Sequence, residues 1–236
     1  MLRSVYARGE RGRRTAARGR LAAVPVVPPE APAPVPFAIH GPTLSLRIPT
    51  VDDAAALLGL ASDPDVTRWF SWGPYADVAQ PRRFIAGLEE ERRTGLKLDL
   101  LAVHHEHGPA GITGLYEFSP RDRRCVCGTW FGKPFWGTGA NRESKALLQH
   151  LAFETLGMQR FGSYSNPENE RSTRALLGVG LRHEGVLRGY HRHGDRYLDV
   201  NIFGLLREQW EASPLRAEFA DRISVVGEPP DAFYAA

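Results

Sequence analysis

Two periods of hydrophobic residues alternate along the chain and predict a mixed α/β fold. In residues 44–48 apolar side chains recur at every second position, which is typical of a strand with one buried face. In residues 137–156 leucines fall on one stripe of a helix, and Gly157 provides a helix stop. Extended along the chain, these periods predict the order strand, two helices, three strands, helix, strand, helix and two strands. That order is typical of helices packed on a mixed sheet with an antiparallel first half.

Turn signals such as Gly108-Pro109 and Gly194-Asp195 separate the expected elements. Residues 210–236 are polar and irregular, so we expect no regular element there. The expected strands are 44–48, 98–104, 110–118, 124–131, 160–164, 183–192 and 197–205. The expected helices are one that begins at Thr50 and those that span 80–94, 137–156 and 169–177, with a short second piece from Asp63 to Phe70 after the first of them.

The first 42 residues differ in amino-acid composition from the rest of the chain. Residues 1–20 contain seven arginines and one acid, and seven of the 18 prolines lie between Pro25 and Pro42. Proline lacks the amide donor and fixes φ, so this stretch is expected to be an extended linker. The expected organisation is a disordered basic and proline-rich tail at 1–42, one domain at 43–210 and a C-terminal tail at 211–236.

Charge and composition argue against nucleic-acid-binding and membrane proteins. The 236 residues carry a formal charge of +3, but the first 20 residues alone hold +6, so the rest is mildly acidic. A basic tail on an acidic body does not favour a nucleic-acid-binding domain. No apolar run reaches the roughly 18 residues of a membrane helix, and the short run Leu21–Val27 does not fit a secretory signal. We therefore expect a cytoplasmic protein without a membrane partner.

The cysteines and the absence of common catalytic motifs exclude several chemistries. Cys125 and Cys127 lie two apart on an expected strand, where they are expected to pack rather than to react or to bridge. No CxxC, HExxH, GxSxG or GxxxxGK[ST] motif occurs. His104, His105 and His107 lie on an expected polar turn without the spacing of a metal site, so no metal is expected.

Candidate chemistry concentrates where the strand 124–131 leads into the helix 137–156. This connection places Gly137 and Gly139 at the expected helix start. A helix N-terminus exposes unpaired amide donors and a partial positive charge, and glycine lets an anion approach those amides. The geometry suits a pyrophosphate, although a plain strand-to-helix turn also explains two glycines at this spacing.

Three motifs resemble those of the GNAT acyl-CoA-dependent N-acetyltransferases. Residues 136–144, WGTGANRES, are similar to the W-G-x-G-x-x-x-E-A of the branch that includes the ribosomal-protein N-terminal acetyltransferases. Residues 166–172, NPENERS, are similar to its N-x-x-N-x-x-S, and 180–188, GLRHEGVLR, to its G-F-x-x-E-G-x-x-R. The resemblance covers residues 44–207. It implies the GNAT fold, with a central, mostly antiparallel sheet flanked by helices, and acetyl-CoA as cosubstrate.

The resemblance also implies a role for each matching residue. Asn169 would hydrogen-bond the pantetheine part of the cofactor, and Ser172 would give a proton to the leaving thiolate. Both residues also suit a helix start, as an N-cap and as an early-turn polar residue. The other cofactor-binding residues would hold the pyrophosphate through backbone amides, namely Gly137, Thr138, Gly139, Ala140 and Asn141, or lie beside the pantetheine arm, namely Trp130 and Phe131.

Three positions depart from the family's pattern. Trp136 and Asn141 stand where the general phosphate signature has Gln or Arg and Gly or Ala. Backbone amides bind phosphate whatever the side chain, so the first departure leaves the phosphate site intact. Val126 replaces a glutamate that many relatives carry as a base candidate.

His191 is the leading candidate for the missing base. Alignment of the last strand with the related branch places it where some members hold a catalytic glutamate. Histidine titrates near about 6.5 and suits a base at neutral pH, although a histidine also fits an exposed hairpin tip. Glu117 and Asp122 are further base candidates.

The expected function is N-acetyl transfer from acetyl-CoA to a primary amine by direct attack in a ternary complex. The acceptor, a small molecule or a protein N-terminus, is left open. Four aromatic residues, Trp69, Phe70, Trp72 and Tyr75, are expected to line either the acceptor pocket or a homodimer interface. Two alternatives are a non-catalytic acyl-CoA-binding module, motivated by the departures above, and nucleic-acid association through the arginine-rich tail.

Overall fold

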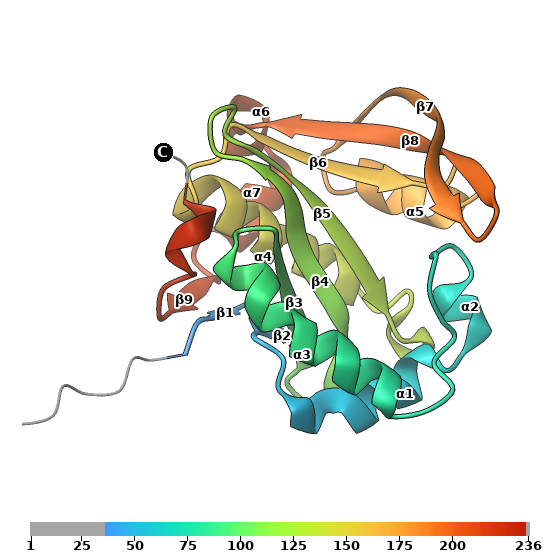
Figure 1. The fold of residues 1–236 in the computed structure, drawn as a ribbon. Helices are drawn as coiled ribbons and strands as arrows, with labels where there is room; N and C mark the ends of the chain where they lie inside the picture. The colour runs from blue at the N-terminus through green and yellow to red at the C-terminus, as the bar shows by residue number, and fades with distance from the viewer. Residues whose placement is uncertain (1–35, 235–236) are drawn as a thin grey trace, which may run out of the picture. The chain divides into compact units, whose positions relative to one another are not determined.

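A nine-stranded mixed sheet forms the centre of the protein. The computed structural model describes residues 36–234, which all belong to one unit of the chain, Pro34–Ala236. The strand order is β7-β8-β6-β5-β4-β3-β2-β1-β9, and every neighbouring pair is antiparallel except β5–β6 (Figure 1). The mostly antiparallel sheet predicted from the sequence is therefore confirmed. The strands are β1 (Ala38–His40), β2 (Leu44–Arg47), β3 (Lys97–His104), β4 (Gly108–Ser119), β5 (Arg124–Phe131), β6 (Arg160–Ser165), β7 (Arg182–His193), β8 (Arg196–Leu206) and β9 (Ser224–Val226).

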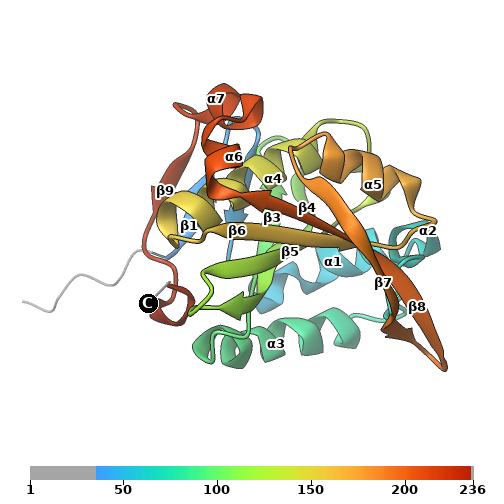
Figure 2. The ribbon, with the colours of Figure 1, turned by 90° about the horizontal axis from the view of Figure 1, so that it is seen from above.

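Helices cover both faces of this sheet. α4 lies on one face together with α5, α6 and α7, and α1 and α3 lie on the other (Figure 2). Among residues 36–234, no helix is both long and apolar enough to span a bilayer. The helices are α1 (Ala54–Ala61), α2 (Pro64–Thr67), α3 (Ala79–Arg93), α4 (Ala140–His150), α5 (Glu170–Leu177), α6 (Arg207–Glu211) and α7 (Pro214–Phe219).

Two hydrophobic clusters hold the layers together. The leucine stripe predicted for α4 is fully buried, with Leu147, Leu148 and Leu151 at 0% exposure in the larger cluster. On the opposite face, Leu57 of α1 and Ile85 of α3 pack in a second cluster. Both faces of the central strands are therefore buried under helices.

Among residues 36–234, the one parallel pair of strands, β5 and β6, separates towards one end. The two strands are paired from Arg124↔Arg160 to Cys127↔Ser163, and beyond that point both continue without pairing with each other. The two strands therefore part after Cys127 and Ser163. This opening lies directly before the loop that leads from β5 into α4.

The helix predicted for 137–156 begins and ends differently from the expectation. It starts at Ala140 because Gly137 and Gly139 adopt φ values of +78° and +95°, which lie in the left-handed region. It remains α-helical to His150, and a π-helical turn at Leu151–Thr155 continues it. The preceding glycines thus form a loop in front of the helix rather than its first turn.

The N-terminal boundary of the folded domain lies earlier than residue 43. β1 pairs with β2 and β9, and Phe37 and Ile39 are 5% and 0% exposed in the core. The expected tail at 1–42 therefore includes a strand, because Phe37 and Ile39 supply the apolar side chains that the prolines before them lack. The tail and linker expected for residues 1–35 lie outside the described residues.

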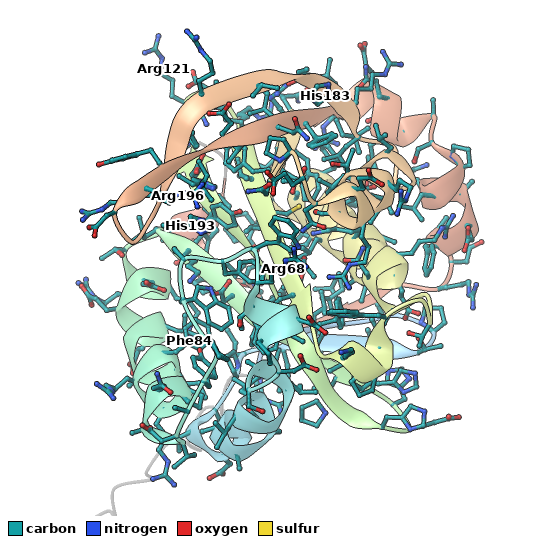
Figure 3. All side chains as sticks on the ribbon, turned by 90° about the vertical axis from the view of Figure 1, so that its right-hand side faces the viewer. Arg68, Phe84, Arg121, His183, His193 and Arg196 are labelled. Atoms are coloured by element: carbon teal, nitrogen blue, oxygen red, sulfur yellow. The ribbon has the colours of Figure 1, made fainter. Side chains whose placement is uncertain are left out.

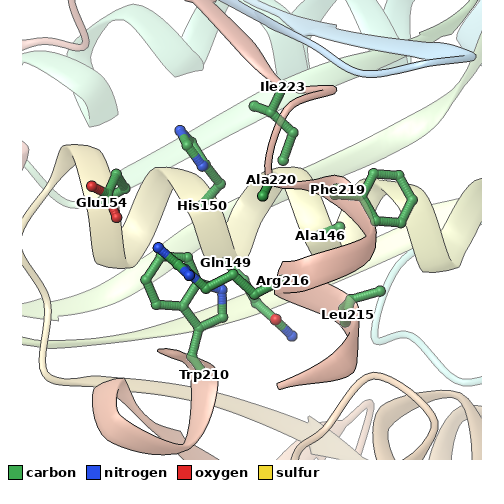
Figure 4. A pocket seen from close by; sticks show the side chains of 10 residues that line it. All are labelled: Ala146, Gln149, His150, Glu154, Trp210, Leu215, Arg216, Phe219, Ala220 and Ile223. Atoms are coloured by element: carbon green, nitrogen blue, oxygen red, sulfur yellow. The ribbon is translucent and has the colours of Figure 1, made fainter. Parts of the chain in front are cut away.

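The C-terminal residues are also part of the fold, contrary to the expectation of an irregular tail after Trp210. Trp210, Leu215, Phe219 and Phe233 are each at most 5% exposed and belong to the larger cluster. Their apolar positions are too widely spaced to show a helix or strand period, which explains why the sequence did not reveal them. A cavity of about 170 Å³ remains between this segment and α4, lined by Trp210, Leu215 and Phe219 among others (Figure 4).

Candidate active site

The loop before α4 forms an open cradle of backbone amides. A Cβ atom at Gly137 or Gly139 would meet no atom within 4 Å, so the space above this loop is free. Gly139 is the N-cap of the 11-residue helix α4, whose first amides have no acceptor inside the helix. The cradle and the helix dipole together fit a pyrophosphate. The loop therefore has the geometry of a site for an anionic group.

Side chains of the loop residues mostly stabilise the loop itself. The Thr138 hydroxyl donates to the Phe135 carbonyl at 2.9 Å and accepts from the Ala140 amide at 3.4 Å. Ala140 is 4% exposed and packs in the core, and the Asn141 carbonyl accepts from the Ser144 hydroxyl at 2.9 Å. The side chains of Thr138 and Ala140 are thus engaged within the protein, so a ligand at the cradle would meet the backbone of these residues.

Trp130 and Phe131 lie on β5 beyond the point where it parts from β6, and their side chains enter opposite cores. Trp130 is 9% exposed and packs against Trp72, with ring centroids 5.7 Å apart. Phe131 is 5% exposed and lies in the cluster on the α4 face. The opening between β5 and β6 is thus bordered by the backbone of these two residues.

Asn169 and Ser172 form the N-terminal cap of α5. The Asn169 side chain accepts from the Ser172 amide at 3.1 Å, which realises the capping role that the sequence indicated. Both residues are half-buried, and the Ser165 hydroxyl of β6 lies 3.0 Å from the Thr173 hydroxyl of α5. The cap is therefore held beside the C-terminal end of β6, at the opening.

Arg171 connects this cap with the phosphate loop. Its guanidinium carbon lies 3.5 Å from the centroid of the Trp136 ring, which is within cation–π range. The Trp136 indole in turn donates to the Phe131 carbonyl at 2.8 Å. The departure from Gln or Arg at position 136 is thus accompanied by an arginine from α5 at the same place, a pairing that the sequence alone did not indicate.

His191 belongs to a cluster of polar and aromatic side chains on β4, β6 and β7. The Tyr164 hydroxyl donates to Glu117 at 2.8 Å, and it lies 3.4 Å from the Tyr190 hydroxyl. The His191 ring packs edge-on against Tyr164, with centroids 5.6 Å apart. Among the described residues, no hydrogen bond joins His191 to Ser172. Asp122 is not part of this cluster, because it accepts from Ser119 at the β4–β5 turn.

The environment of this cluster shifts two pKa values in ways that matter for acid–base chemistry. Partial loss of hydration lowers the pKa of His191 below 6.5, and the neighbouring His193 lowers it further. Desolvation and the hydrogen bonds to Tyr190 and Glu117 raise the pKa of Tyr164 well above its ordinary value. These shifts favour the neutral form of His191, which can accept a proton, and the protonated form of Tyr164.

The cluster around Tyr164 and His191 lies on the face of the sheet opposite α4. The aromatic run, by which we mean Phe70, Trp72 and Tyr75, lies on the same face. The Trp72 ring stacks on Phe70 with centroids 5.3 Å apart and packs at a tilt against Tyr75 with centroids 5.2 Å apart, in addition to its contact with Trp130 of β5. The tip of the β7–β8 hairpin, marked by His193 and Arg196, reaches towards the face that carries α3 (Figures 2 and 3). The aromatic run thus packs against the strand that borders the opening.

Glu143 is a site residue whose role the sequence did not reveal. This carboxylate is 7% exposed and accepts hydrogen bonds from the Thr43 amide, the Thr43 hydroxyl and the Leu44 amide at 2.8, 2.6 and 2.9 Å. It therefore anchors the first turn of α4 to β2. The glutamate of the W-G-x-G-x-x-x-E-A motif is the signal that marked this position.

The histidines at 104–107 and the two cysteines pack against neighbouring groups. His104 and His107 stack with centroids 4.6 Å apart, and within residues 36–234 no group of three or more His, Cys, Asp or Glu side chains could hold a metal ion. Cys125 and Cys127 are both buried as free thiols, and burial raises the pKa of Cys125. A thiol of raised pKa is a weak nucleophile, so Cys125 packs as expected, and Cys127 is buried beside it.

Sequence comparison identifies a family over the same region. The model of the acetyltransferase (GNAT) domain matches residues 43–182. The uncharacterized N-acetyltransferase p20 of Bacillus licheniformis is 29% identical over 168 residues, which cover 71% of this chain and 94% of p20.

Two solved structures share the fold. A GCN5-related N-acetyltransferase from Brucella melitensis superposes with a TM-score of 0.69 at 20% identity, covering 79% of this chain and 88% of that one. Spermidine N-acetyltransferase from Vibrio cholerae, in complex with CoA and spermine, gives a TM-score of 0.62 at 16% identity, covering 72% and 99%. At these identities the likeness concerns the fold alone. The family match spans more than half of the chain and includes the amide cradle, the parted strands and the capped helix, so this protein belongs to the GNAT acetyltransferases.

Proposed function

We propose that this protein transfers the acetyl group of acetyl-CoA to a primary amine by direct attack in a ternary complex. The observation that carries the proposal is the open amide cradle at the N-terminus of α4, next to the opening between β5 and β6. Membership of the GNAT family supports acetyl-CoA as the donor. Bound there, acetyl-CoA would supply an activated thioester.

Binding of the donor would rely on backbone groups and one side-chain charge. The amides of Gly137 to Asn141 would hold the pyrophosphate, and the Asn169 amide group would donate to the pantetheine arm beside Trp130 and Phe131. Arg171, stacked on Trp136, would add positive charge next to the cradle. A charge-assisted hydrogen bond of this kind contributes about 1.5–3 kcal/mol.

Proton transfer would involve Ser172 and His191. The acceptor amine must lose a proton as it bonds to the acetyl carbon, and the lowered pKa of His191 supports its role as the base. Ser172 would give a proton to the departing sulfur from the first turn of α5. Glu117 is the second base candidate, because its carboxylate is held at the same cluster by Tyr164.

The acceptor is proposed to be an amine of low pKa, such as a protein N-terminus. An α-amine with a pKa of about 7.7–8.0 is roughly one-fifth neutral near pH 7.4, whereas a lysine amine near about 10.4 is neutral to about one part in a thousand. Val126 occupies the usual glutamate position and is 7% exposed, so a strong base is missing there. The resemblance to the ribosomal-protein N-terminal acetyltransferase branch supports the same acceptor class.

A turnover assay tests this function. Purified protein is mixed with acetyl-CoA and a panel of amines, and release of the CoA thiol is followed. The proposal expects amine-dependent thiol release. Binding of acetyl-CoA without transfer to any amine would support the alternative of a non-catalytic acyl-CoA-binding module, for which the departures at Val126 and Asn141 are the motive.

A further inference from the structure

Within residues 36–234, Lys145 differs from the other two lysines in forming no ion pair with a carboxylate. The sequence contains only three lysines. Lys97 pairs with Asp99 at 2.7 Å, and Lys133 pairs with Asp65 at 2.6 Å. Lys145 is 3% exposed, and none of the ion pairs within residues 36–234 includes it.

The partners of the Lys145 amino group are a hydroxyl and a sulfur of β5. Its Nζ lies 2.6 Å from the Thr129 hydroxyl and 3.3 Å from the Cys127 sulfur. An ammonium has three N–H donors, so these two partners leave one donor for a further acceptor. Removing an ammonium from water without a counter-charge costs several kcal/mol. A buried cation in this position therefore destabilises the folded protein when no anion is near it. It would stabilise a negative charge that develops beside it.

The position of Lys145 in the fold indicates where such a negative charge would develop. Cys127 is the last residue of β5 that pairs with β6, and Thr129 is the second residue beyond that point. Nζ thus contacts β5 at the residues where its pairing with β6 has ended. Lys145 is also six residues beyond Gly139, which corresponds to about 9 Å along the helix axis at a rise of about 1.5 Å per residue. The same helix therefore carries the amide cradle at its start and, further along, a lysine side chain at the parting of β5 from β6.

We propose that the Lys145 ammonium faces the sulfur of the bound thioester and stabilises the negative charge that develops on it. The inference rests on the proposed acetyl transfer. The amine nitrogen bonds to the acetyl carbon, the carbon–sulfur bond breaks, and its electron pair goes to the sulfur. The base takes the proton of the amine, and the sulfur takes a proton from Ser172, whose hydroxyl is reprotonated by solvent. Lys145 transfers no proton in this scheme and acts through the charge of its ammonium.

The test compares Lys145→Met with Gln149→Met in the full chain. Gln149 lies one turn further along α4, is 0% exposed and also has a polar side chain, with its amide donating to the Val179 carbonyl at 2.9 Å. Both variants remove a buried polar group from the same helix. They differ in that Gln149 contacts the segment after α5 rather than the opening of β5.

Three readouts are expected to separate the two variants. Lys145→Met should unfold at the same or a higher temperature than the wild type, because an unpaired buried charge is removed. Its turnover per folded molecule should fall about 100-fold, as for the loss of one preorganised charge-stabilising donor. The thiol of bound CoA, followed by thiolate absorbance, should titrate below about pH 7.5 in the wild type and near or above about 8.5 in Lys145→Met. Gln149→Met should retain wild-type turnover and thiol titration.

The opposite results would overturn the inference. An unchanged thiol titration in Lys145→Met would show that Nζ does not face the sulfur, and full turnover with lowered stability would show a structural role. Should Lys145→Met not fold, Lys145→Gln gives the same comparison. If the wild type binds no CoA, the proposed function fails, and this inference fails with it. CoA binding with an unchanged titration in the variant rejects the lysine role alone.

Discussion

Single residues determine the proposed donor site through backbone conformation and through charge. Gly137 and Gly139 adopt positive φ values, and this conformation leaves the amides at the start of α4 uncovered. Side chains with a β-carbon adopt that region only with strain. The positive charge near the cradle comes from Arg171, which is distant in sequence from the loop. A change at Gly139 should therefore affect donor binding more than folding.

Gly139→Val is expected to weaken acetyl-CoA binding. The branched side chain would fill the space above the amides and strain a φ of +95°, so at least about 2 kcal/mol, or roughly 30-fold in Kd, should be lost. Calorimetry on the folded variant measures this. Gly108→Val is the matched control, since Gly108 also has a positive φ (+73°) and open space but lies in the β3–β4 turn. Equal affinity in both variants would reject the phosphate assignment.

Replacement of His191 is expected to change the pH dependence of turnover. The base must be neutral, and the pKa of His191 is lowered, so wild-type activity should fall only as pH drops below about 6.5. His191→Ala should reduce turnover about 10–1,000-fold and remove this acidic limb. His107→Ala, at the β3–β4 turn, should leave both unchanged. Full activity of His191→Ala with an intact acidic limb would exclude the histidine and favour Glu117.

The sequence predicted most of the elements because their apolar periods are regular. The strand at Arg124–Phe131 has the expected bounds, and the leucine stripe of α4 is buried as predicted. β1 and the segment after Trp210 were missed, because each contributes only a few apolar residues without a period. The network of Glu143 was also missed, since it joins residues 100 positions apart. Such long-range polar contacts leave no local pattern in a sequence.

Glu143→Ala is expected to destabilise the protein by about 1–3 kcal/mol. The substitution leaves the buried Leu44 amide without its acceptor, which costs about 1–3 kcal/mol, whereas water can replace the acceptor of the more exposed Thr43 donors. Denaturant unfolding measures the loss. Glu218→Ala is the control, because Glu218 forms an exposed ion pair with Arg142 and such pairs contribute about 0–1 kcal/mol. Similar stability of the two variants would contradict the anchoring role.

For the whole molecule, the sheet separates two approaches to the opening between β5 and β6. The amide cradle and Lys145 belong to α4 on one face, whereas the aromatic run and the His191 cluster lie on the other. A donor held on the first face and an acceptor on the second would meet at the parted strands. The family and the cradle were predictable from motifs. The partner of Trp136 and the cluster around Tyr164 were not predictable, because each brings together side chains from elements that are separate in the sequence.

The central claim is tested most directly by thiol release with two matched peptides. One peptide carries a free α-amine and no lysine, and the other has an acetylated N-terminus and a single lysine. The account predicts amine-dependent release from acetyl-CoA with the first peptide, at least about 10-fold faster at pH 7.4 than with the second, because far more of an α-amine is neutral at that pH. Preference for the lysine peptide would contradict the acceptor assignment. Acetyl-CoA binding without release for either peptide or for any other amine of the panel would contradict acetyl transfer itself.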